Sequence, residues 1–385
     1  MKKILLGNEA IARGLLENGC SFAASYPGTP ASEILTSFLQ MAKVEKSPVI
    51  GEWSINEKVA FETALSVSYA GGRAAVSMKQ VGLNVACDPL MSSAYTGVKG
   101  GFLIVSADDP GPHSSQTEQD SRMMAMMAKI PVLDPATPQE AKEMIRAAYQ
   151  ISEEFEIPVM LRPTTRICHS RQGMTLEAIP DPLVASGFTK DPQRWAATPR
   201  YRYTLHHRLN QKIEAIAARF GKDSYQRILG NSNARQCILS SGVALAHTYD
   251  ALKELNLEDQ IALYQVKMPY PLQAQAILDE LVPFEKILLI EETFPVMELQ
   301  LALRSRIQGR LDGSIPPQGE LIRTCWFRLS AILLNFPKGK RPLPPAKPGA
   351  PPFVPDARTG LPFTPSAKPC PRGSTRVTSV VIPWG

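Results

Sequence analysis

Short apolar runs alternate with helix-type patterns over the first 171 residues of this 385-residue chain, and this alternation limits the folds open to it. The apolar runs lie at residues 21–25, 48–53, 74–78, 101–106 and 158–162. Parallel strands need long crossover connections, usually helices, so strands that alternate with helices indicate a parallel sheet covered on both faces. We therefore expect an α/β domain over residues 1–171.

Local signals place helices between these runs. Thr29 is a suitable N-cap residue, and Pro30 a suitable first helical residue, for a helix that ends near Ala42. The motif T-P-Q-E at 137–140 has the form of a capping box with proline at its first helical position. It predicts a helix that ends near Phe155.

The remaining chain divides into three parts. Residues 172–235 mix polar, aromatic and basic residues, and we expect a linker that contains a helix near 203–220. From 236 to 321 the alternation of strand and helix patterns returns, which predicts a second, smaller α/β domain. Residues 322–385 form a proline-rich, basic tail.

The positive charge of the chain comes from this tail. The whole sequence has a formal net charge of +6 and 34 prolines, which by itself suggests an anionic partner such as nucleic acid. Residues 322–385 hold 10 Lys and Arg residues, one acidic residue and 13 prolines, whereas the other 321 residues hold 32 basic and 35 acidic ones. We therefore expect no nucleic-acid partner.

Neither a membrane nor a secretory pathway is indicated. No apolar run reaches the roughly 18 residues that a membrane-spanning helix requires, and the apolar run at the start is too short for a signal peptide. The six cysteines show no C-x-x-C or C-x-x-H spacing, which argues against a metal site and a disulfide framework. A cytoplasmic, reduced protein without a membrane partner is expected.

The stretch E-W-S-I-N-E-K at 52–58 follows one expected strand and opens a helix expected at 55–70. Ser54 and Glu57 have the spacing of a capping box, in which both side chains serve only the helix end. A carboxylate at this corner can instead point out of the carboxyl edge of a parallel sheet, where ligands bind in such folds. There it could hydrogen-bond a heterocycle nitrogen and act as an acid or base. The pattern leaves both interpretations open.

Three more polar segments follow expected strands: Tyr-Pro-Gly-Thr-Pro at 26–30, the stretch 78–84 and the run 108–120. Each of them alone is typical of a turn or a helix cap. The carboxyl ends of parallel strands share one edge of the sheet. Several such ends rich in Gly, Thr, Asn, Gln and Glu therefore favour a binding site at that edge.

These motifs resemble those of a known family, the alpha subunits of indolepyruvate:ferredoxin oxidoreductases, within the thiamine-diphosphate-dependent 2-oxoacid:ferredoxin oxidoreductases. The resemblance covers Met1 to about Leu321. It rests on G-N-E-A-I-A-R-G at 7–14, Y-P-G-T-P at 26–30, W-S-I-N-E-K-V-A at 53–60, M-K-Q-V-G-L-N-V-A at 78–86, H-S-S-Q-T-E-Q-D at 113–120 and L-D-G-S-I-P-P-Q-G-E-L at 311–321. It implies a pyrimidine-binding, thiamine-diphosphate type of parallel-sheet domain at 1–171 and a transketolase C-terminal-like α/β domain at 236–321.

The resemblance implies roles for particular residues. Glu57 would match the glutamate that hydrogen-bonds N1′ of the aminopyrimidine and favours the imino tautomer, which removes the C2 proton of the cofactor. Thr29 would match the threonine of the family's Y-P-x-T-P motif, near the substrate carboxylate. Arg122 and His113 are further candidates for substrate binding. Lys79 is either a cation of the site or a solvated lysine.

Other positions are expected to contact the cofactor. The same resemblance assigns Tyr26, Pro27 and Gly28 to cofactor binding. Gly82 and Asn84 are expected to let the backbone approach the pyrimidine.

The resemblance also implies parts that the sequence does not display. Enzymes of this type hold thiamine diphosphate and Mg²⁺ with a diphosphate-binding domain, and the family adds a domain with 4Fe-4S clusters. Neither the run C-x-x-C-x-x-C-x-x-x-C-P nor a G-D-x-G motif follows Leu321, and no metal ligand is assigned in this chain.

Two interpretations of residues 322–385 stay open. Their composition is that of a disordered, proline-rich tail. Alternatively, a one-nucleotide slip near Leu321 makes them an out-of-frame translation. Codon degeneracy permits C-P-G-C-P-H-R-A across 353–361 and I-Y-P-S-D-I-G-C-Y-T-L-G across 374–385 in one shifted frame, and both strings resemble the family's third domain. Resequencing the gene around the Leu321 codon tests this hypothesis.

We therefore expect a subunit of a ferredoxin-dependent oxidoreductase that oxidatively decarboxylates aryl-pyruvates such as indolepyruvate to aryl-acyl-CoA. The resemblance implies a beta subunit and ferredoxin as partners, CoA and a 2-keto acid as substrates, and iron–sulfur clusters as electron carriers. Two alternatives stay open. The chain could be an inactive truncated fragment that folds or assembles without catalysis, or a related oxidoreductase that acts on pyruvate or branched substrates.

Overall fold

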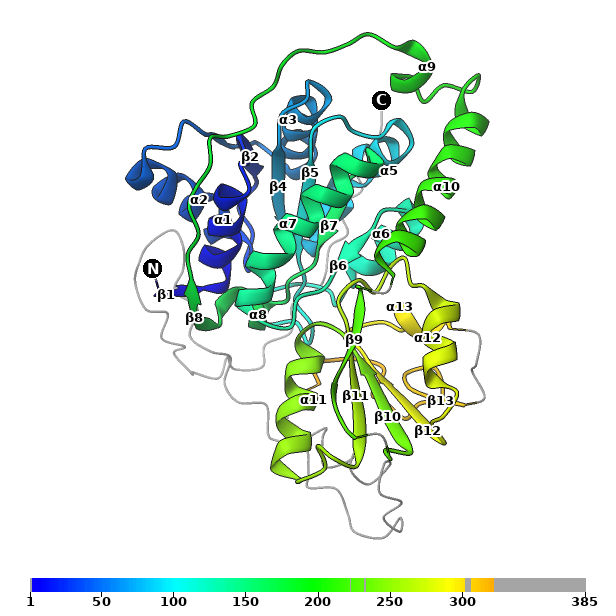
Figure 1. The fold of residues 1–385 in the computed structure, drawn as a ribbon. Coiled ribbons are helices and arrows are strands. Elements are labelled where there is room, and N and C mark those ends of the chain that lie inside the picture. The colour runs from blue at the N-terminus through cyan, green and yellow to red at the C-terminus, as the bar shows by residue number, and fades with distance from the viewer. Residues whose placement is uncertain (1, 222, 232, 302–305, 322–385) are drawn as a thin grey trace, which may run out of the picture. The chain divides into compact units, whose positions relative to one another are not determined.

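The computed structural model describes residues 2–221, 223–231, 233–301 and 306–321. The proline-rich tail and both strings expected from a shifted frame lie outside the described residues. The described chain contains two largely parallel sheets, one after the other along the sequence, with a long connection between them (Figure 1). The expected α/β class is confirmed.

Within the described residues, the first domain contains a six-stranded, entirely parallel sheet with the strand order β3-β2-β4-β5-β7-β6. Its strands are β2 (Phe22–Ser25), β3 (Ile50–Trp53), β4 (Ala74–Lys79), β5 (Phe102–Ala107), β6 (Val132–Leu133) and β7 (Val159–Leu161). β2, β4 and β5 are buried along nearly their whole length, as expected of strands covered on both faces.

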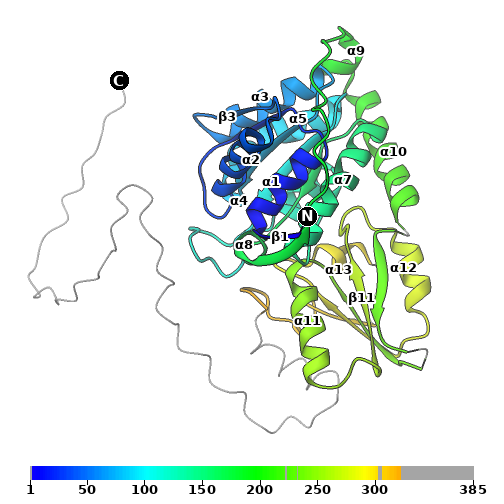
Figure 2. The ribbon, with the colours of Figure 1, turned by 60° about the vertical axis from the view of Figure 1, so that its left-hand side comes forward.

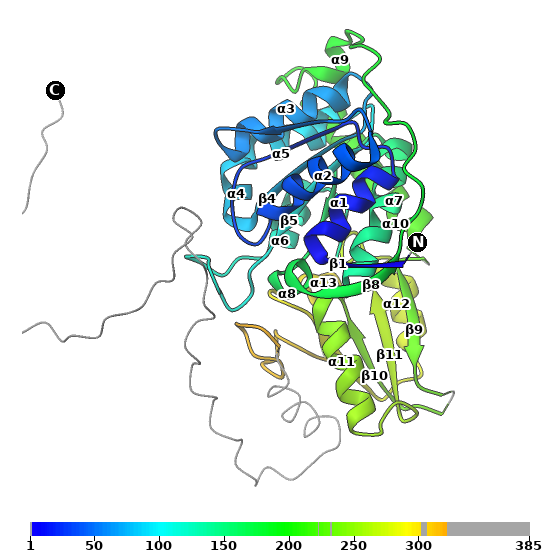
Figure 3. The ribbon, with the colours of Figure 1, turned by 90° about the vertical axis from the view of Figure 1, so that its left-hand side faces the viewer.

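Helices cover both faces of this sheet (Figures 1 and 3). They are α1 (Gly7–Glu17), α2 (Ser32–Glu45), α3 (Glu57–Tyr69), α4 (Gln80–Val85), α5 (Cys87–Thr96), α6 (Ser121–Ala128), α7 (Pro138–Phe155) and α8 (Thr165–His169). α1 packs against α2 and α7, whereas α3 packs against α5. The strand order reverses direction at β3, so right-handed crossovers place α2 and α3 on opposite faces.

The capping box predicted for α7 is confirmed as the start of that helix. Thr137 is the N-cap, and its side-chain oxygen accepts a hydrogen bond from the Glu140 N–H at 3.1 Å. The Glu140 carboxylate reaches back one residue further than expected and accepts the Ala136 N–H at 2.9 Å. The helix therefore begins at Pro138 with its first N–H groups satisfied.

Two further pieces flank the first sheet. β1 (Lys2–Leu6) and β8 (Arg171–Thr175) form an antiparallel pair in which Ile4 lies opposite Gly173 (Figure 2 shows β1 beside α8). The connection to the second sheet contains α9 (Pro192–Trp195) and α10 (Arg202–Phe220), which confirms the helix expected near 203–220. α10 packs against α5 and α7.

The second sheet has the strand order β13-β12-β10-β11-β9, and only β9 runs antiparallel to its neighbour among the described strands. Its elements are β9 (Tyr225–Leu229), β10 (Gln236–Ser240), α11 (Gly242–Glu254), β11 (Ile261–Val266), α12 (Ala274–Leu281), β12 (Lys286–Ile290), α13 (Val296–Gln300) and β13 (Ile307–Gln308). β9 falls within the range that the sequence predicts as a linker. Separate apolar clusters cover the two faces of this sheet.

Main-chain hydrogen bonds join the two domains. The Val132 N–H donates to the Tyr270 carbonyl at 2.8 Å, and the Asp134 N–H donates to the Lys267 carbonyl at 3.0 Å. The edge strand β6 of the first sheet is therefore paired with the chain that follows β11. None of the described helices combines the length and the apolar character that crossing a bilayer requires.

Candidate functional site

The carboxyl ends of β2, β3, β4 and β5 lie at one edge of the first sheet, and the predicted polar segments follow them there. The structure brings four of these segments into contact: the loop 26–31, the start of α3, the helix α4 and the loop 108–120. We call this set of segments the sheet-edge site. Its position agrees with the site expected from the sequence.

Glu57 is the first residue of α3, and it does not cap that helix. The N-cap is Asn56, whose side-chain oxygen accepts a hydrogen bond from the Val59 N–H at 2.9 Å. Ser54 instead donates to Glu52 at 3.2 Å. The capping-box interpretation of Ser54 and Glu57 is therefore wrong, because Asn56 is the residue that satisfies the exposed N–H group.

The Glu57 side chain lies directly against Gly82 in α4. A β-carbon on residue 82 would fall 2.4 Å from Glu57 Oε1 and 2.5 Å from Glu57 Cγ, so this arrangement requires glycine. Glu57 is half-buried, and no hydrogen bond or ion pair to its carboxylate occurs within the described residues. A carboxylate in this state at the ligand-binding edge of a parallel sheet is available to a ligand.

Thr29 does not cap α2, contrary to the prediction. α2 begins only at Ser32, with Ala31 as its N-cap residue. A tight turn comes first, because the Ala31 N–H donates to the Gly28 carbonyl at 2.8 Å and the Gly28 N–H donates to Ser32 Oγ at 2.9 Å. The exposed Thr29 hydroxyl is therefore not used by the helix end.

Lys79 ends β4 and reaches the loop that follows β5. Its Nζ donates to the Ser114 carbonyl at 2.9 Å and to the Ser114 hydroxyl at 3.3 Å. Burial lowers the pKa of Lys79, and the nearby Asp109 carboxylate opposes this effect. A β-carbon on Gly28 would lie 3.2 Å from Lys79 Cβ, so the loop after β2 packs closely against the Lys79 side chain. Lys79 is thus held between two segments of the sheet-edge site.

Asp109 shapes the loop that follows β5. Its Oδ2 accepts hydrogen bonds from the N–H groups of His113 and Ser114 and from the Ser115 hydroxyl, at 2.7 to 3.1 Å. Burial acts to raise the pKa of Asp109, but these hydrogen bonds outweigh it and lower the pKa. The Gln80 amide donates to Ser115 at 2.9 Å, which attaches the loop to the start of α4.

His113 lies on the same loop and pairs with a residue from the second domain. Its Nε2 is 3.1 Å from Glu320 Oε1, and the other oxygen of Glu320 is 2.5 Å from an Arg166 nitrogen. Glu320 belongs to the stretch L-D-G-S-I-P-P-Q-G-E-L at 311–321. Sequence reasoning used that stretch only for the family resemblance and did not find Glu320, because no local pattern connects it with His113.

Arg122 is not brought to the sheet-edge site. Its guanidinium is fully buried and pairs with Asp120 at 2.6 Å and with Glu291 of the second domain at 3.1 Å. The attraction of Asp120 is the main effect that offsets burial, and the pKa of Arg122 is raised. Arg162, which the sequence did not single out, lies in the same buried network and pairs with Asp108 at 2.7 Å. The side chains of both arginines therefore lie at the junction of the two domains.

The remaining predicted cofactor contacts lie on exposed parts of the same edge. Tyr26 and Pro27 are exposed on the loop after β2, and Asn84 is exposed on α4. Their roles stay predictions.

The sheet-edge site suits one end of thiamine diphosphate. Glu57 offers a carboxylate to a heterocycle nitrogen, and glycine at position 82 gives the Glu57 side chain the space that it occupies. No group of three or more His, Cys, Asp or Glu side chains in the described part of the chain could hold a metal ion. Mg²⁺ and the 4Fe-4S clusters stay predictions for which these residues supply no ligand set.

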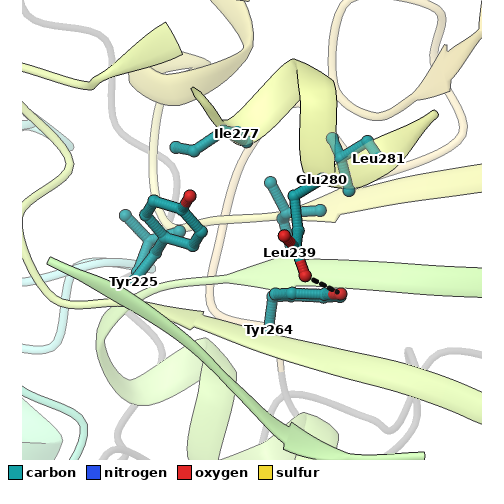
Figure 4. Close-up of a pocket in the computed structure, with 7 residues that line it drawn as sticks. Tyr225, Leu239, Tyr264, Ile277, Glu280 and Leu281 are labelled. Carbon is teal, nitrogen blue, oxygen red and sulfur yellow. Dashed lines mark hydrogen bonds between the residues drawn. The ribbon is translucent and has the colours of Figure 1, made fainter. Parts of the chain in front are cut away.

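Figure 4 shows a pocket in the second domain, away from the predicted site residues. It is lined by Tyr225, Leu239, Tyr264, Val266, Ile277, Glu280 and Leu281. The Tyr264 hydroxyl donates to the Glu280 carboxylate at 3.0 Å, and burial is the main cause that raises the pKa of Tyr264. Two polar groups of this largely apolar pocket, those of Tyr264 and Glu280, are therefore bonded to each other.

A family model described as pyruvate flavodoxin/ferredoxin oxidoreductase, thiamine diP-bdg, matches residues 13–219 of the chain. This range is more than half of the sequence and contains the whole sheet-edge site. The chain belongs to this family. The pyruvate flavodoxin/ferredoxin oxidoreductase family is the one to which the sequence motifs also point.

Curated relatives of the chain are subunits of indolepyruvate oxidoreductases. The chain is 41% identical over 303 residues to the indolepyruvate oxidoreductase subunit IorA of Thermococcus kodakarensis, covering 77% of this chain and 46% of that protein. It is 38% identical to the subunit of the same name from Methanothermobacter thermautotrophicus, covering 82% and 52%. The chain thus spans about half the length of the curated relatives it matches.

Solved structures of low sequence identity share the fold of this family member. A 2-oxoglutarate:ferredoxin oxidoreductase from Magnetococcus marinus matches with a TM-score of 0.66 at 15% identity, covering 80% of this chain and 62% of its own. A split-gene transketolase matches with a TM-score of 0.51 at 14% identity, covering 79% and 88%. Both support the expected fold class of a thiamine-type domain with a transketolase-like domain.

Proposed function

We propose that this family member is part of the alpha subunit of an enzyme that uses thiamine diphosphate to decarboxylate an aryl-pyruvate, such as indolepyruvate, to an aryl-acyl-CoA. The names of its IorA relatives support this substrate class. A beta subunit, ferredoxin as electron acceptor and CoA as co-substrate complete the proposed enzyme. Its Mg²⁺ and 4Fe-4S clusters are held outside the described residues, and the cytoplasm is its proposed location.

The observation that carries this proposal is the Glu57 carboxylate against Gly82. The helix cap next to it is Asn56, so capping does not explain the glutamate. Glycine at position 82 gives the carboxylate its space, although glycine is a poor helix former. A half-buried acid that is neither a cap nor part of an ion pair fits a role toward a ligand.

When bound, thiamine diphosphate supplies the nucleophilic carbon and the electron sink for decarboxylation. In the proposal, Glu57 hydrogen-bonds N1′ of its aminopyrimidine ring and exchanges a proton there, which is general acid–base catalysis. Gly82 lets the Glu57 side chain take its position against α4. Backbone groups of the loop after β2 and of α4, at Tyr26, Pro27, Gly28 and Asn84, form the surroundings of the ring.

The substrate contacts that we propose involve the loop after β2 and the end of β4. Thr29 has a hydroxyl that no helix cap uses, and Lys79 has an ammonium group held beside it. Both suit the carboxylate of a 2-keto acid. His113 is the third candidate for this contact, while Arg122 is not proposed as a substrate contact because it is buried at the junction of the domains.

Titration of the chain with thiamine diphosphate and Mg²⁺ by calorimetry tests the proposal. We expect the wild-type chain to bind weakly, because the proposed Mg²⁺–diphosphate contacts lie outside the described residues, and Glu57→Gln to bind at least about tenfold more weakly still, equivalent to about 1.4 kcal/mol. Glu62→Gln is the matched control, because Glu62 lies on the same helix and is exposed in a 3.9 Å pair with Lys58. Binding by Glu57→Gln as tight as that of the wild type, or no binding by the wild type, contradicts the proposal.

A further inference from the structure

Ser114 and Ser115 attach the loop that follows β5 to the other segments of the sheet-edge site. Ser114 accepts hydrogen bonds from Lys79 through its carbonyl and its hydroxyl, and its hydroxyl also donates to the Thr29 carbonyl at 3.4 Å. Ser115 accepts the Gln80 amide at 2.9 Å. The positions of Lys79 and of the Thr29 backbone therefore depend on the position of this loop.

The neighbouring residue His113 attaches the same loop to the last described residues of the chain. Both carboxylate oxygens of Glu320 are used, one by His113 at 3.1 Å and one by Arg166 at 2.5 Å. One residue earlier, the Gly319 N–H donates to the Glu118 carboxylate at 2.8 Å. Three contacts thus fasten the segment 316–321 to the first domain.

The Glu320 contacts are better shielded from water than ordinary surface ion pairs. The Glu320 side chain is 10% exposed and its partners His113 and Arg166 are 36% and 39% exposed, whereas the side chains of the surface pair Arg235 and Glu285 are 78% and 63% exposed. Ion pairs that are shielded from water interact through a lower effective dielectric, and exposed pairs contribute little. Glu320 can therefore restrict the movement of the loop.

We propose that Glu320 is a positioning residue of the sheet-edge site. Arg166 of α8 holds the Glu320 carboxylate, Glu320 fixes the loop after β5 through His113, and through Ser114 that loop fixes Lys79 and the Thr29 backbone. This inference rests on the proposed function, because it adds Glu320 to the machinery of that same site. Its immediate consequence, the immobilisation of Lys79, needs no bound ligand.

Chemical labelling of Lys79 in the ligand-free chain tests the inference. A short pulse of a succinimidyl ester acylates accessible lysine amines, and peptide mass spectrometry gives the ratio of labelling at Lys79 to that at Lys58. Lys58 is a suitable internal reference, because it lies on α3 next to the site and pairs with Asp88 instead of with the loop. A change in overall protein stability alters the labelling of both lysines, whereas release of the loop alters the labelling of Lys79 alone.

Three variants and one control complete the experiment. Glu320→Ala removes the contacts with His113 and Arg166, Glu320→Gln keeps the shape of the side chain but removes its charge, and Glu320→Asp restores the charge. Glu285→Gln is the control, because it breaks an exposed ion pair of the second domain that does not touch the loop. Hydrogen–deuterium exchange of the peptide 111–118 and the thermal midpoint are recorded on the same samples.

We expect Glu320→Ala and Glu320→Gln to raise the Lys79 to Lys58 ratio at least about threefold and to speed exchange in 111–118. Glu320→Asp should recover at least half of this change, and Glu285→Gln should leave the ratio unaltered. An unchanged ratio in both Glu320→Gln and Glu320→Ala overturns the inference. An equal rise in Glu285→Gln also overturns it, since the effect would then reflect general loosening. If Glu320→Ala does not fold, Glu320→Gln and His113→Gln decide by the same ratio.

These readouts separate the inference from the proposed function. Labelling and exchange need no thiamine diphosphate, so a chain that fails to bind the cofactor still reports whether Glu320 holds the loop. Conversely, a loop that does not respond to Glu320 leaves the assignment of Glu57 untouched.

Discussion

Glu57 and Gly82 contact each other between α3 and α4 so closely that a β-carbon on residue 82 would stand 2.4 Å from Glu57 Oε1. The atoms in its way are the far end of a flexible side chain, and backbone atoms are not among them. A substitution at this position therefore displaces the glutamate more than it disturbs the fold.

Gly82→Ala should separate binding from stability. We expect its free energy of unfolding to change by less than about 1 kcal/mol. Alanine favours the helix over glycine by about that amount, and this gain offsets the cost of displacing the Glu57 side chain. Its affinity for thiamine diphosphate should fall at least about tenfold, because the Glu57 carboxylate must move. Urea unfolding and calorimetric titration measure the two effects. Gly173→Ala is the control, since nothing lies within 4 Å of its β-carbon position, and it should change neither quantity.

The identity of the α3 cap gives a second prediction. Asn56→Ala should lower the free energy of unfolding by about 1 kcal/mol, because the Val59 N–H loses its side-chain acceptor. Ser54→Ala should cost clearly less, since Ser54 donates to Glu52 and caps nothing. Parallel urea titrations compare the two. A larger loss of unfolding free energy in Ser54→Ala than in Asn56→Ala would show that Ser54, and not Asn56, caps α3.

The buried acids between the domains predict the pH dependence of stability. Burial raises the pKa of Glu292 to about 7 from its ordinary value of 4.5. The folded chain then binds more protons than the unfolded chain between these values, so this contribution is complete below pH 4.5 and is lost as the pH rises through about 7. The shift corresponds to at most about 3 kcal/mol.

Glu292→Gln tests this sign. Unfolding free energies measured between about pH 5 and pH 8 should fall less steeply for the variant than for the wild type. Part of the slope should remain, because burial also raises the pKa of Glu291 to about 7. Equal slopes for both proteins would show that Glu292 does not titrate as described.

Arg122 gives a prediction about the junction between the domains. Arg122→Ala leaves the carboxylates of Asp120 and Glu291 buried without this partner, and we expect a loss of about 3 to 5 kcal/mol in unfolding free energy. Arg235→Ala, which breaks an exposed pair with Glu285, should cost less than about 1 kcal/mol. Chemical denaturation of both variants measures this contrast. A negligible effect of Arg122→Ala would mean that the guanidinium serves a ligand and not the fold.

Most strands of the first sheet could be predicted, because parallel strands form short continuous apolar runs. The segments 74–78 and 101–106 are examples that the structure confirms as β4 and β5, whereas the short β6 and, in the second sheet, β9 and β13 were not predicted. α1 was not predicted, although Glu9, Arg13 and Glu17 follow each other at helical spacing, and in the fold this helix is buried nearly all round. α4 has only six residues, too few for a periodic pattern.

The site could be predicted only in part. Glu57 and Gly82 could be singled out, but the sequence left Ser54, Asn56 and Glu57 as competing caps until the backbone showed which one bonds the helix. Arg122 stands beside the polar run 108–120 in the sequence, yet its side chain turns into the domain junction. The pairing of Glu320 with His113 depends on the packing of the second domain on the first, which no local pattern encodes.

The central claim is that Glu57 exchanges a proton with the aminopyrimidine of thiamine diphosphate, and proton exchange at C2 of that cofactor tests it most directly. With the chain, Mg²⁺ and thiamine diphosphate in deuterated buffer, NMR follows loss of the C2 proton. We expect the wild type to accelerate exchange at least about 100-fold over free cofactor, and Glu57→Gln to remove the acceleration while keeping the wild-type unfolding midpoint. Exchange in Glu57→Gln as fast as in the wild type, or no acceleration by the wild type, would contradict the claim.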